Sequence, residues 1–210
     1  YLIQQDLREP VASEVSENVD IAIVGGGLVG SSLACTLERA DLSVVLIEAA
    51  ETPEIPLSFD QRKLALAQRS IDALGRLGVL SLLRAPPTVI RRIHVSRTGD
   101  FGRTLLDAAE FGHPAFGAVV LAQDLGLALA KRVSCLQQTQ RICPARVSAC
   151  HFAAEGARLT LATAEGEKHL SARLVVAADG TDSFIRKSAG IATHTHDYGQ
   201  TLFVSSLKAD

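Results

Sequence analysis

A glycine-rich segment has the residue types and the spacing that binding a pyrophosphate requires. Gly25-Gly26-Gly27-Leu28-Val29-Gly30 fits the pattern G-x-G-x-x-G. Gly25 permits a tight turn, Gly27 lets a pyrophosphate approach the backbone, and Gly30 allows a following helix to pack closely. The free N–H groups at the N-terminus of such a helix would attract the phosphates.

An acidic residue completes the pattern. Glu48 lies 18 residues after Gly30, at the end of the next apolar run. A carboxylate there can accept hydrogen bonds from ribose hydroxyls and would repel a 2′-phosphate. We therefore predict a dinucleotide site. The alternative is a glycine turn that binds nothing, and the spacing alone does not distinguish FAD from NAD.

A β-α-β unit is needed to position these residues. Asp20–Val24 and Ser43–Ile47 are short runs rich in β-branched residues, typical of strands buried on both faces. Leu28–Arg39 between them has helical spacing. Because a helix joins them, the two strands are expected to be parallel.

The remaining chain alternates between helical and strand patterns. Helices are expected at Asp60–Leu80 and at Asp124–Leu136, the latter with Asp124 as a possible N-cap. Strands are expected at Ile90–Ser96, Arg103–Leu106, Ala118–Leu121, Val147–Phe152, Arg158–Thr163 and His169–Ala178, and Thr193–Leu207 alternates weakly.

Two other places could contact the same ligand. Asp179 follows a buried strand, where ligands of open α/β sheets bind, and Gly180 would let a ligand approach the backbone. Asp179 could at the same time cap the following helix. Arg62 is a permanent cation that suits a pyrophosphate, although it could instead be a solvent-facing helix arginine paired with Asp60.

The composition restricts the class of protein. A net charge of −2 and an aromatic content of 4% give no reason to expect nucleic acid. No uninterrupted apolar run is long enough to span a bilayer. The four cysteines form no metal or disulfide pattern, so we expect reduced, mostly buried thiols in a cytoplasmic protein.

Two polar clusters have plain interpretations. His194-x-His196-Asp197 offers only two imidazoles and one carboxylate, which favours a solvated polar strand over a metal site, and we predict no metal. Arg91, Arg92 and Arg97 form a basic patch that fits an exposed strand face better than an anion site.

Several segments resemble one known family. Phe59–Leu66 is similar to the D-x-R segment of the ubiquinone-biosynthesis hydroxylases, and Val176–Arg186 to the Asp-Gly motif of the wider class A aromatic hydroxylases. Ile93–Ser96 and Val119–Gln123 also resemble this family. The resemblance implies FAD as cofactor and NAD(P)H as co-substrate. It also implies an α/β fold, in which a Rossmann-like FAD-binding domain with a parallel sheet is interleaved with part of a β-rich substrate domain.

The resemblance also assigns residues to the cofactor. It implies that Arg62 contacts the pyrophosphate or the flavin edge, and that Gln123, before its helix, lies on the flavin side. The backbone of Val147 would lie near the adenine, and Asp179–Gly180 near the ribityl chain and pyrophosphate. It identifies no catalytic base, so the catalytic residues are unknown.

The expected domain organisation follows the same family. It comprises a leader at 1–18, the FAD-binding domain at 19–88 and 121–190, a substrate-domain excursion at 89–120, and the start of a truncated substrate domain at 191–210. The chain contains no methionine, even at position 1, and no second Gly-Asp motif of the family. We therefore expect a piece of a longer protein that binds FAD weakly and does not hydroxylate alone.

The implied activity is hydroxylation of a polyprenylated phenol by O₂ in ubiquinone biosynthesis. The implied partners are that phenol, an enzyme complex of the pathway and the inner membrane as a peripheral contact. Two alternatives remain: a flavin oxidoreductase of the same superfamily with another substrate, and a non-catalytic dinucleotide-binding module.

Overall fold

The main body of the protein is a six-stranded sheet. The computed structural model describes residues 17–50, 62–201 and 203. The strand order is β8-β2-β1-β11-β10-β9. The strands are β1 Glu17–Val24, β2 Val44–Ile47, β8 Thr139–Ile142, β9 Ala145–Ala153, β10 Gly156–Thr163 and β11 Gly166–Ala177. Strands β8, β2, β1 and β11 are parallel, whereas β11, β10 and β9 form an antiparallel meander. The predicted α/β fold with a parallel sheet is confirmed.

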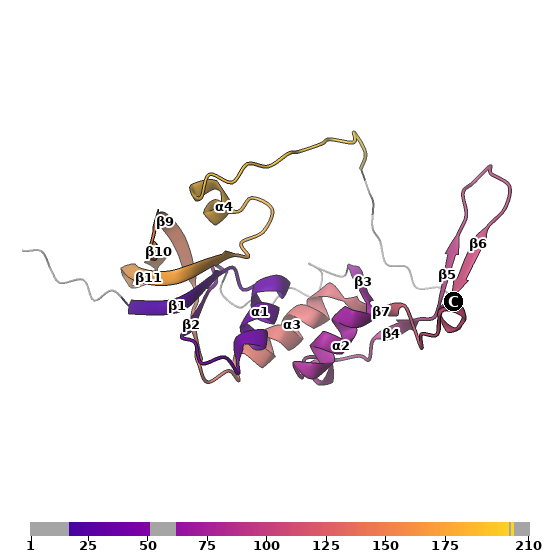
Figure 1. The fold of residues 1–210 in the computed structure, drawn as a ribbon, viewed down its shortest axis with the longest axis horizontal. Helices are drawn as coiled ribbons and strands as arrows, with labels where there is room; N and C mark the ends of the chain where they lie inside the picture. Colours follow the sequence, from indigo (N-terminus) through magenta and orange to yellow (C-terminus); the bar gives the residue numbers. More distant parts are fainter. Residues whose placement is uncertain (1–16, 51–61, 202, 204–210) are drawn as a thin grey trace, which may run out of the picture.

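Two different layers cover the parallel strands (Figure 1). Alternate residues of a strand point to opposite faces of the sheet. Ile23 and Leu46 therefore pack toward the helices α1 (Leu28–Leu37) and α3 (Ala122–Val133). Their neighbours Ala22, Val24, Val45 and Ile47 pack toward Leu159 and Leu161 of the meander and Ile185 of α4 (Phe184–Ser188).

Smaller elements extend from this body. Strands β3 (Lys63–Ala67), β7 (Gly117–Leu121) and β4 (Thr88–Ile90) form an antiparallel sheet in the order β3-β7-β4. Strands β5 (Arg92–Val95) and β6 (Thr104–Asp107) form a separate hairpin, which projects from the molecule in Figure 1. The remaining elements are α2 (Gln68–Arg76) and the 3-10 turns Leu80–Leu82 and Ala108–Phe111.

The single helix expected at Asp60–Leu80 is wrong over its first half. Residues Lys63–Ala67 form β3, in which half-buried leucines at 64 and 66 alternate with exposed residues and pair with β7. Only Gln68–Arg76 is helical. Over so few residues, the apolar pattern fits the periodicity of a helix as well as that of a strand. The pairing with β7 determines that these residues form a strand.

Two expected strands also differ. Ile90–Ser96 is divided at Arg91 between β4, which pairs with β7, and β5, which pairs with β6. The described residues of Thr193–Leu207 form no strand. The hairpin expected around Glu155–Gly156 is confirmed as β9 and β10.

The four cysteines and the histidine cluster lie within the described residues. Cys35 is buried, but Cys135 is exposed and Cys143 and Cys150 are half-buried, so the expectation of mostly buried thiols is wrong. All four thiols are free. Within the described ranges, no three His, Cys, Asp or Glu side chains are grouped as a metal site would need. No helix in those ranges is long and apolar enough to cross a membrane.

Asp124 does not cap α3. The N-cap position is Leu121, and Asp124 lies inside the first turn, buried. Its carboxylate accepts hydrogen bonds from the backbone N–H of Arg84, at 3.1 Å to each oxygen, and of Ala85, at 3.4 Å. Asp124 therefore fastens the segment after α2 to α3.

We expect Asp124→Ala to lower the free energy of unfolding by about 2 kcal/mol, because it leaves partly buried backbone N–H groups without an acceptor. Asp124→Asn retains one acceptor oxygen and should lose less than half of that. Urea denaturation of the three proteins measures both effects. Equal stability of Asp124→Ala and the wild type would contradict the assigned role.

Candidate functional site

The glycine segment forms a tight loop between β1 and α1. The N–H of Gly25 donates to the carbonyl oxygen of Ile47 at 2.8 Å, and its φ of 105° lies in the region that favours glycine. A side chain at Gly30 would overlap the carbonyl oxygen of Gly25. A Cβ at Gly27, in contrast, would meet no atom within 4 Å. The loop is thus packed against backbone atoms at Gly25 and Gly30, whereas Gly27, where α1 begins, faces open space.

A serine that the sequence analysis missed helps to hold this loop. The buried Ser31 donates its hydroxyl to the carbonyl oxygen of Gly26 at 2.8 Å. Position 27, the N-cap of α1, makes no side-chain capping bond, and the first turn of α1 contains no acidic residue. The first N–H groups of α1 therefore lack a competing anion, as a phosphate site requires. A small polar residue directly after Gly30 was the only sequence signal for Ser31.

Glu48 has a structural role that its position alone did not reveal. One carboxylate oxygen accepts the N–H of Gly26 at 2.5 Å, and the other accepts the N–H of Ala50 at 2.7 Å. A carboxylate has roughly four acceptor positions, so acceptor capacity remains for ribose hydroxyls. The Glu48 carboxylate, which was predicted to bind the ribose, thus also holds the glycine loop in place.

Asp179 organises the start of α4. Its carboxylate accepts the hydroxyl of Ser183 at 2.5 Å and the N–H groups of Phe184 and Ile185 at 2.7 and 3.2 Å. The N-cap residue is Ser183, so Asp179 supports the helix from one turn away. Gly180 has open space where a side chain would be.

These contacts change the acidity of Asp179. Partial burial raises the pKa of Asp179. Hydrogen bonds from the Ser183 hydroxyl and from backbone N–H groups, of which that of Ile185 has the largest effect, lower it. Together these hydrogen bonds outweigh burial and leave the pKa below its usual value. A lowered pKa means that the ionised carboxylate stabilises the folded state. This contribution is complete above the unfolded pKa of about 4 and is lost as the pH falls through the folded value.

We therefore expect Asp179→Asn to destabilise the protein at neutral pH, because the neutral amide is a weaker acceptor and also has a donor facing N–H groups. The difference from the wild type should shrink as the pH falls below about 4. Denaturant titrations across this range measure it. A difference that stays constant with pH would show that ionisation of Asp179 is irrelevant to stability.

Two cavities meet at the loop. One of about 520 Å³ is lined by Gly25, Gly27, Glu48, Val147, Asp179 and Gly180, among others. The other, of about 350 Å³, is lined by Gly26, Gly27, Glu48, Arg62, Gln123 and Arg141, among others. Gly27 and Glu48 belong to both. Every predicted cofactor residue except Gly30, which packs behind the loop, therefore lines a cavity at the carboxyl edge of the sheet.

Arg62 and Gln123 come together through the backbone. The carbonyl oxygen of Arg62 accepts the N–H of Ala122 at 2.9 Å, which places Arg62 at the start of α3. Arg62 precedes β3, so the alternative of a helix arginine is wrong, and its suggested partner Asp60 lies outside the described residues. Gln123 lies in the first turn of α3 rather than before the helix, because α3 begins at Ala122.

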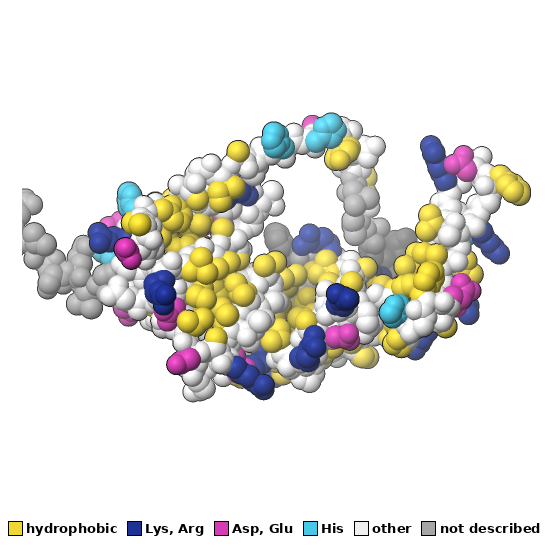
Figure 2. Space-filling view, in the orientation of Figure 1, with side chains coloured by type: hydrophobic (Ala, Val, Ile, Leu, Met, Phe, Trp, Pro, Cys, Tyr) yellow, Lys and Arg dark blue, Asp and Glu magenta, His cyan; other side chains and the backbone are white. Residues whose placement is uncertain are grey.

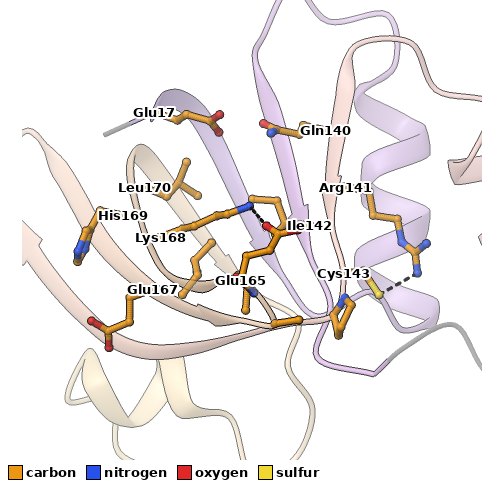
Figure 3. A pocket seen from close by; sticks show the side chains of 14 residues that line it. Glu17, Gln140, Arg141, Ile142, Cys143, Glu165, Glu167, Lys168, His169 and Leu170 are labelled. Atoms are coloured by element: carbon orange, nitrogen blue, oxygen red, sulfur yellow. Dashed lines mark hydrogen bonds and ion pairs between the residues drawn. The ribbon is translucent and has the colours of Figure 1, made fainter. Parts of the chain in front are cut away.

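Arg141 was not predicted as a site residue. It lies on β8, a short strand that the sequence analysis did not recognise, and its guanidinium donates to the Cys143 thiol at 3.3 Å. Figure 3 shows it at the edge of a third cavity, of about 590 Å³. That cavity contains none of the predicted cofactor residues, and its Lys168 and Glu165 pair with each other at 2.7 Å. Apart from Gly30, the predicted cofactor residues therefore line the other two cavities and not this one.

Comparisons with known proteins identify the family of the chain. Residues 18–209 match the FAD binding domain family. The chain is 35% identical over 201 residues to the ubiquinone hydroxylase UbiL of Rhodospirillum rubrum, covering 95% of this chain and 46% of that protein. It is 30% identical to the 3-demethoxyubiquinol 3-hydroxylase of Escherichia coli, covering 93% and 50%. The chain thus spans about half the length of these relatives.

A solved structure shows the same fold. The OxyS anhydrotetracycline hydroxylase from Streptomyces rimosus superposes with a TM-score of 0.71 at 24% identity, covering 86% of this chain and 35% of that one. The fold, the open phosphate loop and the family match lead to one assignment. The chain belongs to the FAD binding domain family, and its cofactor is FAD.

Proposed function

We propose that this chain is the FAD-binding part of a monooxygenase that uses NAD(P)H and O₂ to hydroxylate a polyprenylated phenol in ubiquinone biosynthesis. The observation that carries the proposal is the open loop at Gly27, with Glu48 beside it and the two cavities on either side. The similarity to the ubiquinone hydroxylase of R. rubrum and to the 3-demethoxyubiquinol 3-hydroxylase of E. coli supports the substrate class.

The residues present fit FAD. Gly27 leaves the backbone open to a pyrophosphate, and the first N–H groups of α1 can donate to it. Glu48 retains acceptor capacity for a ribose, while Arg62 and Gln123 line the adjoining cavity. FAD, when bound, supplies the redox and oxygen chemistry of the reaction. The protein's own contribution is to orient the cofactor and to exclude water around it.

The division into domains follows from the same proposal. Residues 19–88 and 121–190 would form the FAD-binding domain, with 89–120 and 191–210 belonging to a substrate domain. The polyprenyl tail of the substrate would bring the enzyme to the inner face of a membrane from the cytoplasm, close to other enzymes of the pathway.

Two measurements test the proposal. The purified chain should bind FAD with quenching of flavin fluorescence, more weakly than a full-length relative, and should prefer FAD to NAD. The gene that contains this reading frame should restore ubiquinone synthesis in a strain that lacks the corresponding hydroxylase, and Gly27→Ala should impair this. Preference for NAD would contradict the cofactor, and failure to complement would contradict the substrate.

A different aromatic substrate is the second candidate. It is favoured by the fold of the anhydrotetracycline hydroxylase, which shows that the same architecture occurs in an enzyme named for a different substrate. Product analysis in the complemented strain separates the two. Hydroxylation of another phenol without restored ubiquinone would favour this second candidate.

A further inference from the structure

The hairpin of β5 and β6 has a surface that the cofactor site does not explain. It projects from the molecule, on the opposite side from the meander and α4 (Figure 1). Phe101, between its two strands, is fully exposed. Val95 and Leu105, near the same end, are 56% and 55% exposed. These side chains have a large apolar area in contact with water.

The apolar side chains lie on both faces of the hairpin. Val95 pairs with Thr104, and His94 pairs with Leu105. Residues paired across an antiparallel ladder share a face and neighbours along a strand do not, so Val95 and Leu105 point in opposite directions. A sheet covered by one protein layer is apolar on one face only. A hairpin end that is apolar on both faces fits a surrounding apolar medium better than a single protein layer.

The charges of the hairpin favour an anionic medium. Residues 91–107 contain four arginines and two aspartates. Arg92 pairs with Asp107 at 2.8 Å, and Arg97 pairs with Asp100 at 3.5 Å. In the part of the chain that the structure describes, no carboxylate pairs with Arg91 or Arg103. Figure 2 shows basic and hydrophobic side chains together along this hairpin.

We propose that the tip of the β5–β6 hairpin, residues 95–105, inserts into an anionic lipid surface, with Phe101 in the interface and Arg103 and Arg97 at the headgroups. Aromatic rings with flanking arginines suit this boundary, since the ring leaves water and the guanidinium contacts phosphate. This inference rests on the proposed function, because a polyprenylated substrate resides in a membrane. Of the basic patch predicted from the sequence, only Arg97 takes part.

Vesicle flotation tests the inference. The chain should float with phosphatidylglycerol-rich vesicles and much less with phosphatidylcholine vesicles, and added salt should weaken binding. Phe101→Ser should reduce the partition coefficient about tenfold. Arg103→Gln should reduce it about fivefold. The matched control Phe152→Ser changes an exposed phenylalanine on β9, 48% exposed, and should float as the wild type does.

The outcomes separate this inference from the proposed function. Phe101→Ser should keep the FAD affinity of the wild type, because the hairpin lines neither cavity. Absent flotation together with intact FAD binding overturns the lipid inference alone. Equal flotation of Phe101→Ser and Phe152→Ser also overturns it. A third outcome also overturns it: the chain fails to float, and Phe101→Ser converts it from a dimer to a monomer. The hairpin tip would then bind a second copy of the chain.

Discussion

Gly30→Ala should destabilise the folded protein by about 3 kcal/mol and remove FAD binding, the largest effect that we expect from one methyl group. The added Cβ would overlap the carbonyl oxygen of Gly25, which is backbone and is held by the pairing of β1 with its neighbours. Either α1 moves away from the sheet or the loop changes its path. Urea denaturation and a flavin fluorescence titration measure the two losses.

Gly27→Ala is the matched control. The same methyl group at position 27 meets no atom within 4 Å, and the backbone there is extended, with φ −68° and ψ −169°. The free energy of unfolding should therefore stay unchanged, while FAD affinity should fall about tenfold or more because the methyl group occupies the approach to the pyrophosphate. If Gly27→Ala bound FAD as the wild type does, the pyrophosphate would not lie at this loop.

Glu48→Ala should reduce FAD affinity about 100-fold. Two losses add in this variant: the acceptor for ribose hydroxyls, and the acceptor that holds the N–H of Gly26 at 2.5 Å. The second loss loosens the loop before any ligand arrives. We therefore also expect the apo protein to lose about 1 kcal/mol of stability, as urea denaturation would show.

Glu48→Gln separates these two roles. The amide oxygen can still accept from Gly26, but the amide nitrogen cannot accept from Ala50, so the apo protein should lose less stability than Glu48→Ala does. The amide lacks the negative charge and has fewer acceptor positions, so FAD should still bind more weakly than to the wild type. Wild-type affinity in both Glu48 variants would exclude the carboxylate from ribose binding.

Local sequence predicted the elements whose partners are close in the chain. The unit around Gly25–Gly30 and the β9–β10 hairpin have short connections and unambiguous periods, and both are present. Lys63–Ala67 could not be recognised as a strand, because its partner residues in β7 lie fifty or more residues away. Thr139–Ile142 was missed for a similar reason: four residues form a strand only beside β2.

The residues of the candidate site could be predicted from the sequence, but most of their hydrogen bonds could not. The carboxyl ends of parallel strands bring Gly25, Glu48 and Asp179 to one edge, which follows from topology. That Glu48 also holds Gly26, and that Asp179 faces the start of α4, depends on side-chain directions that spacing does not fix. The buried Asp124 shows the same limit, since its partners Arg84 and Ala85 are some forty residues away.

The long strand β11 has a consequence for how the protein is made. It pairs with β1 along Leu170–Ala177, about 150 residues after the phosphate loop. At a synthesis rate of roughly 5–20 residues per second, the loop is synthesised roughly 7 to 30 seconds before its neighbour Ala178. Until then β1 has an open edge that can pair with foreign strands. Newly made chains should thus depend on chaperones during that interval. FAD can bind and stabilise only those chains in which β11 has paired with β1.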